Sequence, residues 1–125
     1  MSKKSTILLV DDEPNILVGL EFLLEQAGYR VRTAADGAAA LELVKTDRPD
    51  VAVLDVMMPA MDGFQLAEAL RADPELENLR IVFLTARGQP ADRTAGYRSG
   101  GEVYLTKPFD NAAFLTVIAE LLRYG

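Results

Sequence analysis

Short apolar segments rich in β-branched residues alternate in this chain with longer segments whose apolar residues recur at helical spacing. The short segments span residues 6–10, 29–34, 51–54, 81–84 and 103–105. Most of them are apolar throughout, which is typical of strands that are covered on both faces. Because strand-helix-strand crossovers are right-handed, the alternation predicts an α/β fold, a doubly wound five-stranded parallel sheet with five helices.

The sequence marks the predicted helices with unequal clarity. The first lies between Pro14 and Gly28, the second follows Asp36, the third follows Gly63, and the fifth begins at Asp110, which is a good N-cap residue. The fourth, predicted near residues 90–99, has the fewest apolar residues on its inward side, so we expect it to be the most mobile. The longest loop is predicted at 72–80.

The length of 125 residues is typical of one domain, and no Pro/Ser/Gly-rich linker divides the chain. We therefore expect a single domain over residues 1–125. The first apolar run, at residues 7–10, is too short for a signal peptide or a membrane span. On this basis we expect a cytoplasmic protein that makes no contact with a membrane.

The composition excludes several kinds of chemistry. Thirteen Lys and Arg against nineteen Asp and Glu give a net charge of −6, so we expect no direct contact with nucleic acid. The chain has no Cys and no His, which excludes disulfides, thiolate metal sites, Ser-His-Asp triads and a phosphohistidine of its own. Any chemistry must use carboxylates, hydroxyls, amines or the backbone.

Polar side chains follow four of the five predicted strands, and the carboxyl ends of such strands are where sheets of this kind bind ligands. They are Asp11 and Asp12 after the first strand, Asp55 after the third, Thr85 after the fourth and Lys107 after the fifth. Taken singly, each has an ordinary interpretation: a helix cap, a turn carboxylate, a strand-end hydroxyl or a solvated surface charge. Taken together, three carboxylates would repel one another by about 4 kcal/mol per close pair, and one lysine offsets only part of this.

A divalent cation would relieve this repulsion. The available donors are carboxylate, carbonyl and water oxygens, which favour magnesium, or manganese, over zinc and copper. Magnesium commonly shares its ligands with a phosphate, so the pattern favours phosphoryl chemistry with Asp55 as the nucleophile. Lys107 would then balance charge on the transferred group, and Thr85 would donate a hydrogen bond to one of its oxygens.

Four segments, in order along the whole chain, carry a family resemblance. They are VDDEP at 10–14, LDVMMP at 54–59 with DG at 62–63, LTA at 84–86 and YLTKPF at 104–109. Together they resemble the signature segments of bacterial response-regulator receiver domains, the CheY-like family of two-component phosphorelays. The resemblance implies the strand order 2-1-3-4-5 of the flavodoxin-like fold, an order that the alternation alone does not determine.

The resemblance also implies a role for each site residue. Asp55 corresponds to the phosphoacceptor, Asp12 and Asp55 to direct magnesium ligands, and Asp11 to a residue that helps hold the ion, often through water. The backbone carbonyl of Met57 would be a further ligand. Lys107 would pair with the phosphoryl group, while Thr85 and Tyr104 correspond to the switch pair, in which the Tyr104 ring turns inward after Thr85 moves.

The implied function is that of a switch, in which a phosphohistidine on a sensor histidine kinase or phosphotransfer protein donates its phosphoryl group to Asp55. The acyl phosphate is later hydrolysed. The chain would supply the metal and the catalytic groups for both steps, yet it would work as a switch with a single occupied site rather than as a turnover enzyme. The responding surface would be the fourth helix, fifth strand and fifth helix, and would face an unknown downstream protein or, in a homodimer, a second copy. Its exposed residues would include Arg93, Arg98, Tyr104 and Arg123.

One departure and three alternatives accompany this interpretation. Residues 100–102 are GGE, where the family usually has Ala followed by an acidic pair. A dehalogenase-type phosphohydrolase would need a second acid where Met57 stands, and in a flavodoxin-like electron carrier Asp11 and Asp12 would repel the phosphate. The remaining alternative is a receiver-like interaction module that works without phosphorylation, although such modules usually lack an acidic residue or the lysine.

Overall fold

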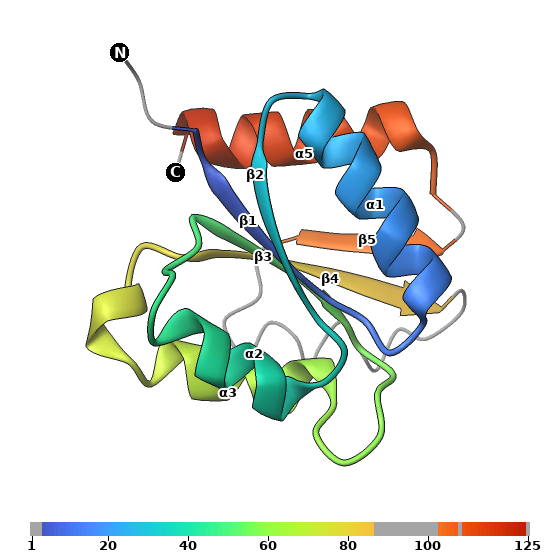
Figure 1. Ribbon diagram of the computed structural model, residues 1–125. Helices are drawn as coiled ribbons and strands as arrows, with labels where there is room; N and C mark the ends of the chain where they lie inside the picture. The colour runs from blue at the N-terminus through green and yellow to red at the C-terminus, as the bar shows by residue number, and fades with distance from the viewer. Residues whose placement is uncertain (1–3, 87–102, 108, 125) are drawn as a thin grey trace.

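The computed structural model describes residues 4–86, 103–107 and 109–124 (Figure 1). Its five strands form one parallel sheet in the order β2-β1-β3-β4-β5. The strands are β1 (Thr6–Val10), β2 (Arg30–Ala34), β3 (Val51–Asp55), β4 (Arg80–Ala86) and β5 (Val103–Lys107). The predicted fold class and strand order are therefore confirmed.

Helices cover both faces of the sheet, with α1 and α5 on one side and α2 and α3 on the other (Figure 1). They are α1 (Pro14–Gln26), α2 (Gly37–Val44), α3 (Gly63–Arg71) and α5 (Asn111–Tyr124). These are the four α-helices of the described residues, whereas the predicted helix at 90–99 and its expected mobility fall on residues that the structure does not describe. At the start of α5, the side chain of Asp110 accepts a hydrogen bond from the Ala113 N–H, as expected of an N-cap residue.

The segment predicted as a loop at 72–80 is only partly irregular. It contains a short 3-10 helix, η1 (Pro74–Leu76), whose first turn is capped by the Asp73 side chain accepting from the Glu75 N–H. Leu76 is buried in the core, and burial of this side chain explains why the segment folds back onto the protein. Pro74 follows Asp73 in this segment, a dipeptide typical of turns, but proline also favours the first turn of a helix.

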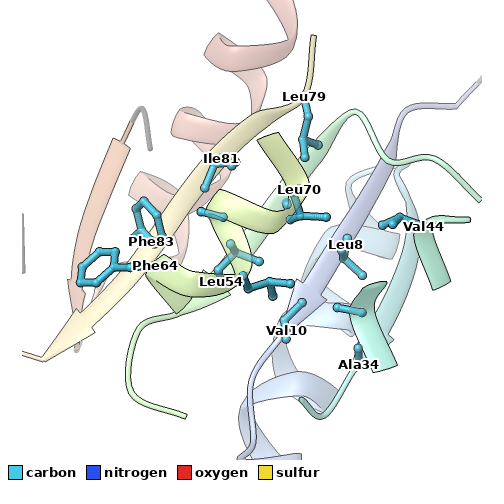
Figure 2. Packing of buried hydrophobic residues seen from close by; sticks show 14 of the residues in the cluster. Leu8, Val10, Ala34, Val44, Leu54, Phe64, Leu70, Leu79, Ile81 and Phe83 are labelled. Carbon is cyan, nitrogen blue, oxygen red and sulfur yellow. The ribbon is translucent and has the colours of Figure 1, made fainter. Parts of the chain in front are cut away.

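The core has two halves, because successive side chains of a strand point to opposite faces of the sheet. Leu8 and Val10 lie in the half beneath α2 and α3, which we call the α2/α3 core and which Figure 2 shows in part. Ile7 and Leu9 lie in the other half, the α1/α5 core. Most buried strand residues are apolar on both faces, as the sequence pattern predicted for strands covered on both sides.

Three of the predicted strands are longer than expected, and the difference places site residues inside the sheet. β4 runs from Arg80 to Ala86 rather than over 81–84, so it includes Thr85. β3 continues through Asp55, which pairs with Leu84, and β5 continues through Lys107, which pairs with Ala86. These residues were predicted to follow the strands, because their charges end the apolar runs. The hydrogen-bond ladder extends further than the apolar pattern and holds both backbones at the carboxyl end of the sheet.

Candidate functional site

Three carboxylates, two just after β1 and one at the end of β3, converge at the carboxyl end of the sheet. Asp11 follows β1, Asp12 comes next, and Asp55 ends β3, the strand beside β1. One carboxylate oxygen from each lies within 4.8 Å of the other two. Asp11 and Asp55 are buried, with 2% and 5% of their surface exposed, whereas Asp12 is exposed. The structure thus brings together the acidic cluster that the sequence predicted.

Lys107 reaches this cluster from the end of β5. Its Nζ lies 3.3 Å from Asp11 Oδ2 and 3.5 Å from Asp55 Oδ1. The same ammonium lies 3.8 Å from Glu13 Oε1, a fourth carboxylate that the sequence analysis did not single out. The position of Glu13 directly after Asp11 and Asp12 was the sequence signal that could have identified it. Among the described residues, three carboxylates, those of Asp11, Glu13 and Asp55, therefore form ion pairs with the Lys107 ammonium.

Backbone N–H groups hold the two buried carboxylates in place. The Glu13 N–H donates to Asp11 Oδ1 at 2.9 Å, which leaves Oδ2 to accept from Lys107. The Met57 N–H donates to Asp55 Oδ1 at 3.3 Å. The ordinary interpretation of Asp11 as a carboxylate that caps the next segment is therefore partly correct, but the same side chain also belongs to the acidic cluster.

The electrostatics of the site follow from burial and from crowded negative charge. Burial and the neighbouring charge of Asp11 raise the pKa of Asp55 to about 6, although Lys107 and the Met57 N–H act in the opposite direction. Burial lowers the pKa of Lys107, but the charges of Asp55 and Asp11 outweigh it and leave the pKa above its usual value. The lysine thus stays protonated, and the cluster retains excess negative charge.

The close packing of α3 against β3 positions the loop that carries Met57. The Gly63 N–H donates to the Val56 carbonyl at 3.0 Å. A Cβ at Gly63 would lie 2.5 Å from the Asp55 carbonyl oxygen, so only glycine fits here without a shift. A capping box between Asp62 and Gln65 secures the first turn of α3. The Met57 side chain is 61% exposed, and its predicted role as a carbonyl ligand stays a prediction.

The two predicted switch residues lie on the same face of the sheet. Thr85 is buried at the carboxyl end of β4, one residue beyond the partner of Asp55. Tyr104 on β5 is directly opposite Phe83, two residues before Thr85, and its half-buried ring packs against the α2/α3 core. The two residues therefore share one face of adjacent strands, two positions apart in the register, and their coupling stays a prediction.

Part of the predicted responding surface falls on undescribed residues. Arg93, Arg98 and the GGE segment at 100–102 are among them, whereas Arg123 is exposed in the last turn of α5. No helix among the described residues is long and apolar enough to cross a membrane.

The donor set fits a hard divalent cation. Every side-chain donor in the cluster is a carboxylate oxygen, and the exposed Asp12 opens the site to water on one side. Magnesium and manganese bind such oxygen ligands and keep several waters. The uncompensated charge around Lys107 would favour a cation here in addition to the lysine.

Comparison with known proteins identifies the family. Residues 7–119 match the response regulator receiver domain. The chain is 37% identical over 123 residues to the response regulator Rre1 of Synechocystis, covering 98% of this chain and 53% of that protein. It is 41% identical to RpaA of the same organism, a DNA-binding dual master transcriptional regulator, covering 94% of this chain and 48% of the relative.

The fold has a close match among solved structures. The chemotaxis protein CheY4 of Vibrio cholerae superimposes with a TM-score of 0.91 at 34% identity, covering 95% of this chain and 99% of that one. The chain spans about half the length of Rre1 and RpaA but nearly all of CheY4. Both the sequence match and the site geometry agree with the resemblance noted above. The chain belongs to the response regulator receiver domain family.

Proposed function

We propose that Asp55 accepts a phosphoryl group from a phosphohistidine on a partner protein and that the resulting acyl phosphate sets the state of a switch. The observation that carries this proposal is the convergence of Asp11, Asp12 and Lys107 on the buried Asp55 carboxylate. An Asp55 oxygen forms the new O–P bond while the N–P bond of the donor breaks, and the electron pair leaves with the imidazole. Because these 125 residues contain no His, the donor histidine lies outside them.

The residues around Asp55 have distinct tasks in this proposal. The pKa of Asp55, about 6, leaves most of its carboxylate ionised at neutral pH, so no general base is needed for attack. Lys107 would pair with the phosphoryl oxygens, and Thr85 would donate a hydrogen bond to one of them. In hydrolysis, water attacks the phosphorus, the acyl phosphate O–P bond breaks, and the Asp55 carboxylate is restored with release of inorganic phosphate.

The proposed metal ligands are the carboxylates of Asp12 and Asp55, the carbonyl of Met57 and, through water, Asp11. A bound Mg²⁺, or Mn²⁺, supplies positive charge that neutralises oxygens of the transferred group. The protein would contribute the acids that hold the ion and the Lys107 ammonium beside them. The chain would catalyse its own phosphorylation and dephosphorylation at one site and act as a switch.

The proposed partners are a sensor histidine kinase or a phosphotransfer protein as donor, and a downstream protein or a second copy as recipient of the signal. The responding surface would include β5 and α5, together with the predicted fourth helix. We further propose that residues 1–125 form one receiver domain in the cytoplasm. The absence of direct nucleic-acid contact stays a prediction for these 125 residues, since RpaA, a DNA-binding relative, is about twice as long as the matched segment.

The proposal is tested by intact mass after incubation with acetyl phosphate and Mg²⁺. The parent protein is expected to gain one phosphoryl group, and a chelator is expected to abolish the gain. Asp55→Asn should gain none, whereas Asp47→Asn, which removes a carboxylate at the opposite end of the sheet, should behave as the parent does. A parent that stays unmodified while it binds Mg²⁺ would instead support the alternative, a receiver-like interaction module that works without phosphorylation.

A further inference from the structure

Three aromatic side chains form a row from the edge of the sheet to α3. The Tyr104 ring on β5 lies 5.3 Å from the Phe83 ring on β4, measured between centroids, with the planes tilted by 31°. Phe83 in turn meets Phe64 of α3 at 4.9 Å, edge to face at 62°. Figure 2 shows the Phe64 and Phe83 rings next to each other. We call these three residues the aromatic row.

The centre of the row has little freedom to move independently. Phe83 is fully buried, and it lies between Leu54 of β3 and Tyr104 of β5 in the strand register. Close-packed interiors transmit displacement rather than absorb it, because they contain few voids that a ring can enter. A change in the position of the Tyr104 ring therefore requires Phe83 to accommodate it, and Phe83 can do so only against its neighbours.

The other end of the row is attached to the site. Phe64 directly follows Gly63, whose backbone packs against the Asp55 carbonyl and whose N–H donates to the Val56 carbonyl. The first turn of α3 is thus in contact with the backbone of Asp55. Tyr104 is connected to this turn through two ring contacts, by a route that does not involve the Thr85 side chain.

We propose that Phe83 is a positioning residue for Tyr104, and that Phe64 and Phe83 couple Tyr104 to the first turn of α3. The inference rests on the proposed function, since it extends the response to phosphorylation of Asp55 from β5 to α3. The α3 turn then changes together with Tyr104, and the protein presents a second responding surface on the α2/α3 side of the sheet.

A matched control lies on the opposite side of the sheet. Phe114 of α5 is also fully buried and also packs against another ring, that of Phe109, with centroids 5.4 Å apart. It belongs to the α1/α5 core, whereas Tyr104 packs against the α2/α3 core. Phe114→Leu therefore removes a comparable ring without touching the aromatic row, and controls for general loosening of the protein.

The test uses fluorine NMR of protein labelled with 3-fluorotyrosine, in which Tyr104→Phe assigns the Tyr104 resonance among the four tyrosines. Acetyl phosphate with Mg²⁺ should shift this resonance in the parent and in Phe114→Leu. Phe83→Leu and Phe64→Leu should lose roughly half or more of the phosphorylation-induced shift. Phe64→Tyr, which keeps a ring at this buried position, should retain the shift and adds one tyrosine resonance of its own. Intact mass on the same samples records whether each variant is phosphorylated.

A second arm needs no phosphorylation. In unmodified protein, Phe64→Leu is expected to move the Tyr104 resonance although Phe64 is two ring contacts away, whereas Phe114→Leu leaves it in place. If both leucine variants in the row are phosphorylated and respond as the parent does, the coupling is wrong. If the parent gains no phosphoryl group, the proposed function fails, and the unmodified arm alone decides whether the aromatic row couples Tyr104 to α3.

Discussion

The two ends of the sheet both carry charged side chains, but only the amino end balances them. There, Asp47 accepts hydrogen bonds from Arg30 and Arg32, and Asp50 accepts one from the Thr6 N–H at 2.8 Å. At the carboxyl end, Asp11, Glu13 and Asp55 share Lys107 while Asp12 lies beside them, and Asp11 and Asp55 are buried. Paired charges hold loops in place, whereas crowded buried acids create a demand for a cation or for neutralisation. This excess of negative charge distinguishes the carboxyl end of the sheet, where the candidate site lies, from the amino end.

The most direct test of this comparison is to remove the Lys107 ammonium that the carboxylates share. Lys107→Met should lower the free energy of unfolding of the metal-free protein by roughly 3 kcal/mol, because it leaves the buried carboxylates of Asp11 and Asp55 without the cation that pairs with them. Arg48→Met, which breaks an exposed pair with Glu75 at the amino end, should cost less than about 1 kcal/mol. Urea denaturation with a chelator present measures both, and equal losses would contradict the comparison.

The next largest effect concerns Asp55 itself. Its pKa of about 6 exceeds the ordinary value of 3.8, so the folded state binds more protons than the unfolded chain between about pH 4 and pH 6. This group therefore destabilises the metal-free protein as pH rises through that window. Asp55→Asn should raise the free energy of unfolding by roughly 2 to 3 kcal/mol at pH 7.5 and by less than about 1 kcal/mol near pH 4.

The matched change at the amino end should have the opposite sign. Asp47→Asn removes the partner of two arginines and should destabilise the protein at neutral pH. Urea titrations across the pH range compare the two variants. If Asp55→Asn raised the free energy of unfolding equally at every pH, the charge of the Asp55 carboxylate would not be the cause of the destabilisation.

Magnesium should remove part of the imbalance. At a concentration tenfold above Kd, the ion is expected to stabilise the folded state by about 1.4 kcal/mol, and a chelator should reverse the effect. Asp12→Asn should abolish the stabilisation at this concentration, and its exposed position favours normal folding. Thermal unfolding with and without Mg²⁺ measures this, with Asp47→Asn as the variant that should still respond. An unchanged response in Asp12→Asn would exclude this residue as a ligand.

The smallest expected effect concerns backbone strain, which also differs between the ends. The left-handed conformation is occupied by Gly28 before β2 at the amino end, but by Ala60, with φ of 68°, in the loop after Asp55. Ala60→Gly should stabilise the protein by about 1 kcal/mol, because glycine adopts this conformation without steric conflict. Gly28→Ala should destabilise it by a similar amount. Urea denaturation measures the free energy of unfolding of both variants. A lower value in Ala60→Gly than in the parent would show that the backbone at Ala60 is not strained.

Much of the fold could be predicted because each strand and helix is marked locally. The apolar runs at 6–10 and 51–54 matched strands, and Asp36 and Asp110 preceded helices. The strand order required the family resemblance, because the alternation is compatible with other orders. The η1 helix was missed because its stability depends on burial of Leu76 by segments distant in sequence.

The sequence predicted which residues form the candidate site but not how these residues differ in burial. Asp11, Asp12, Asp55 and Lys107 were identified from their positions after strands, and they converge. Nothing in the pattern indicated that Asp11 is buried while the adjacent Asp12 is exposed. Glu13 was missed because it follows the acidic pair without standing at a strand end of its own.

By itself, the sequence determined which groups would be available at the functional end, because parallel strands deliver their last residues to one edge of the sheet. Only the tertiary structure decided how strongly those groups would affect one another. The pKa of Asp55 and the contacts of Phe83 depend on distances between β1, β3, β4, β5 and α3. Burial and electrostatic energy are set by neighbours in space, which no local pattern of residues specifies.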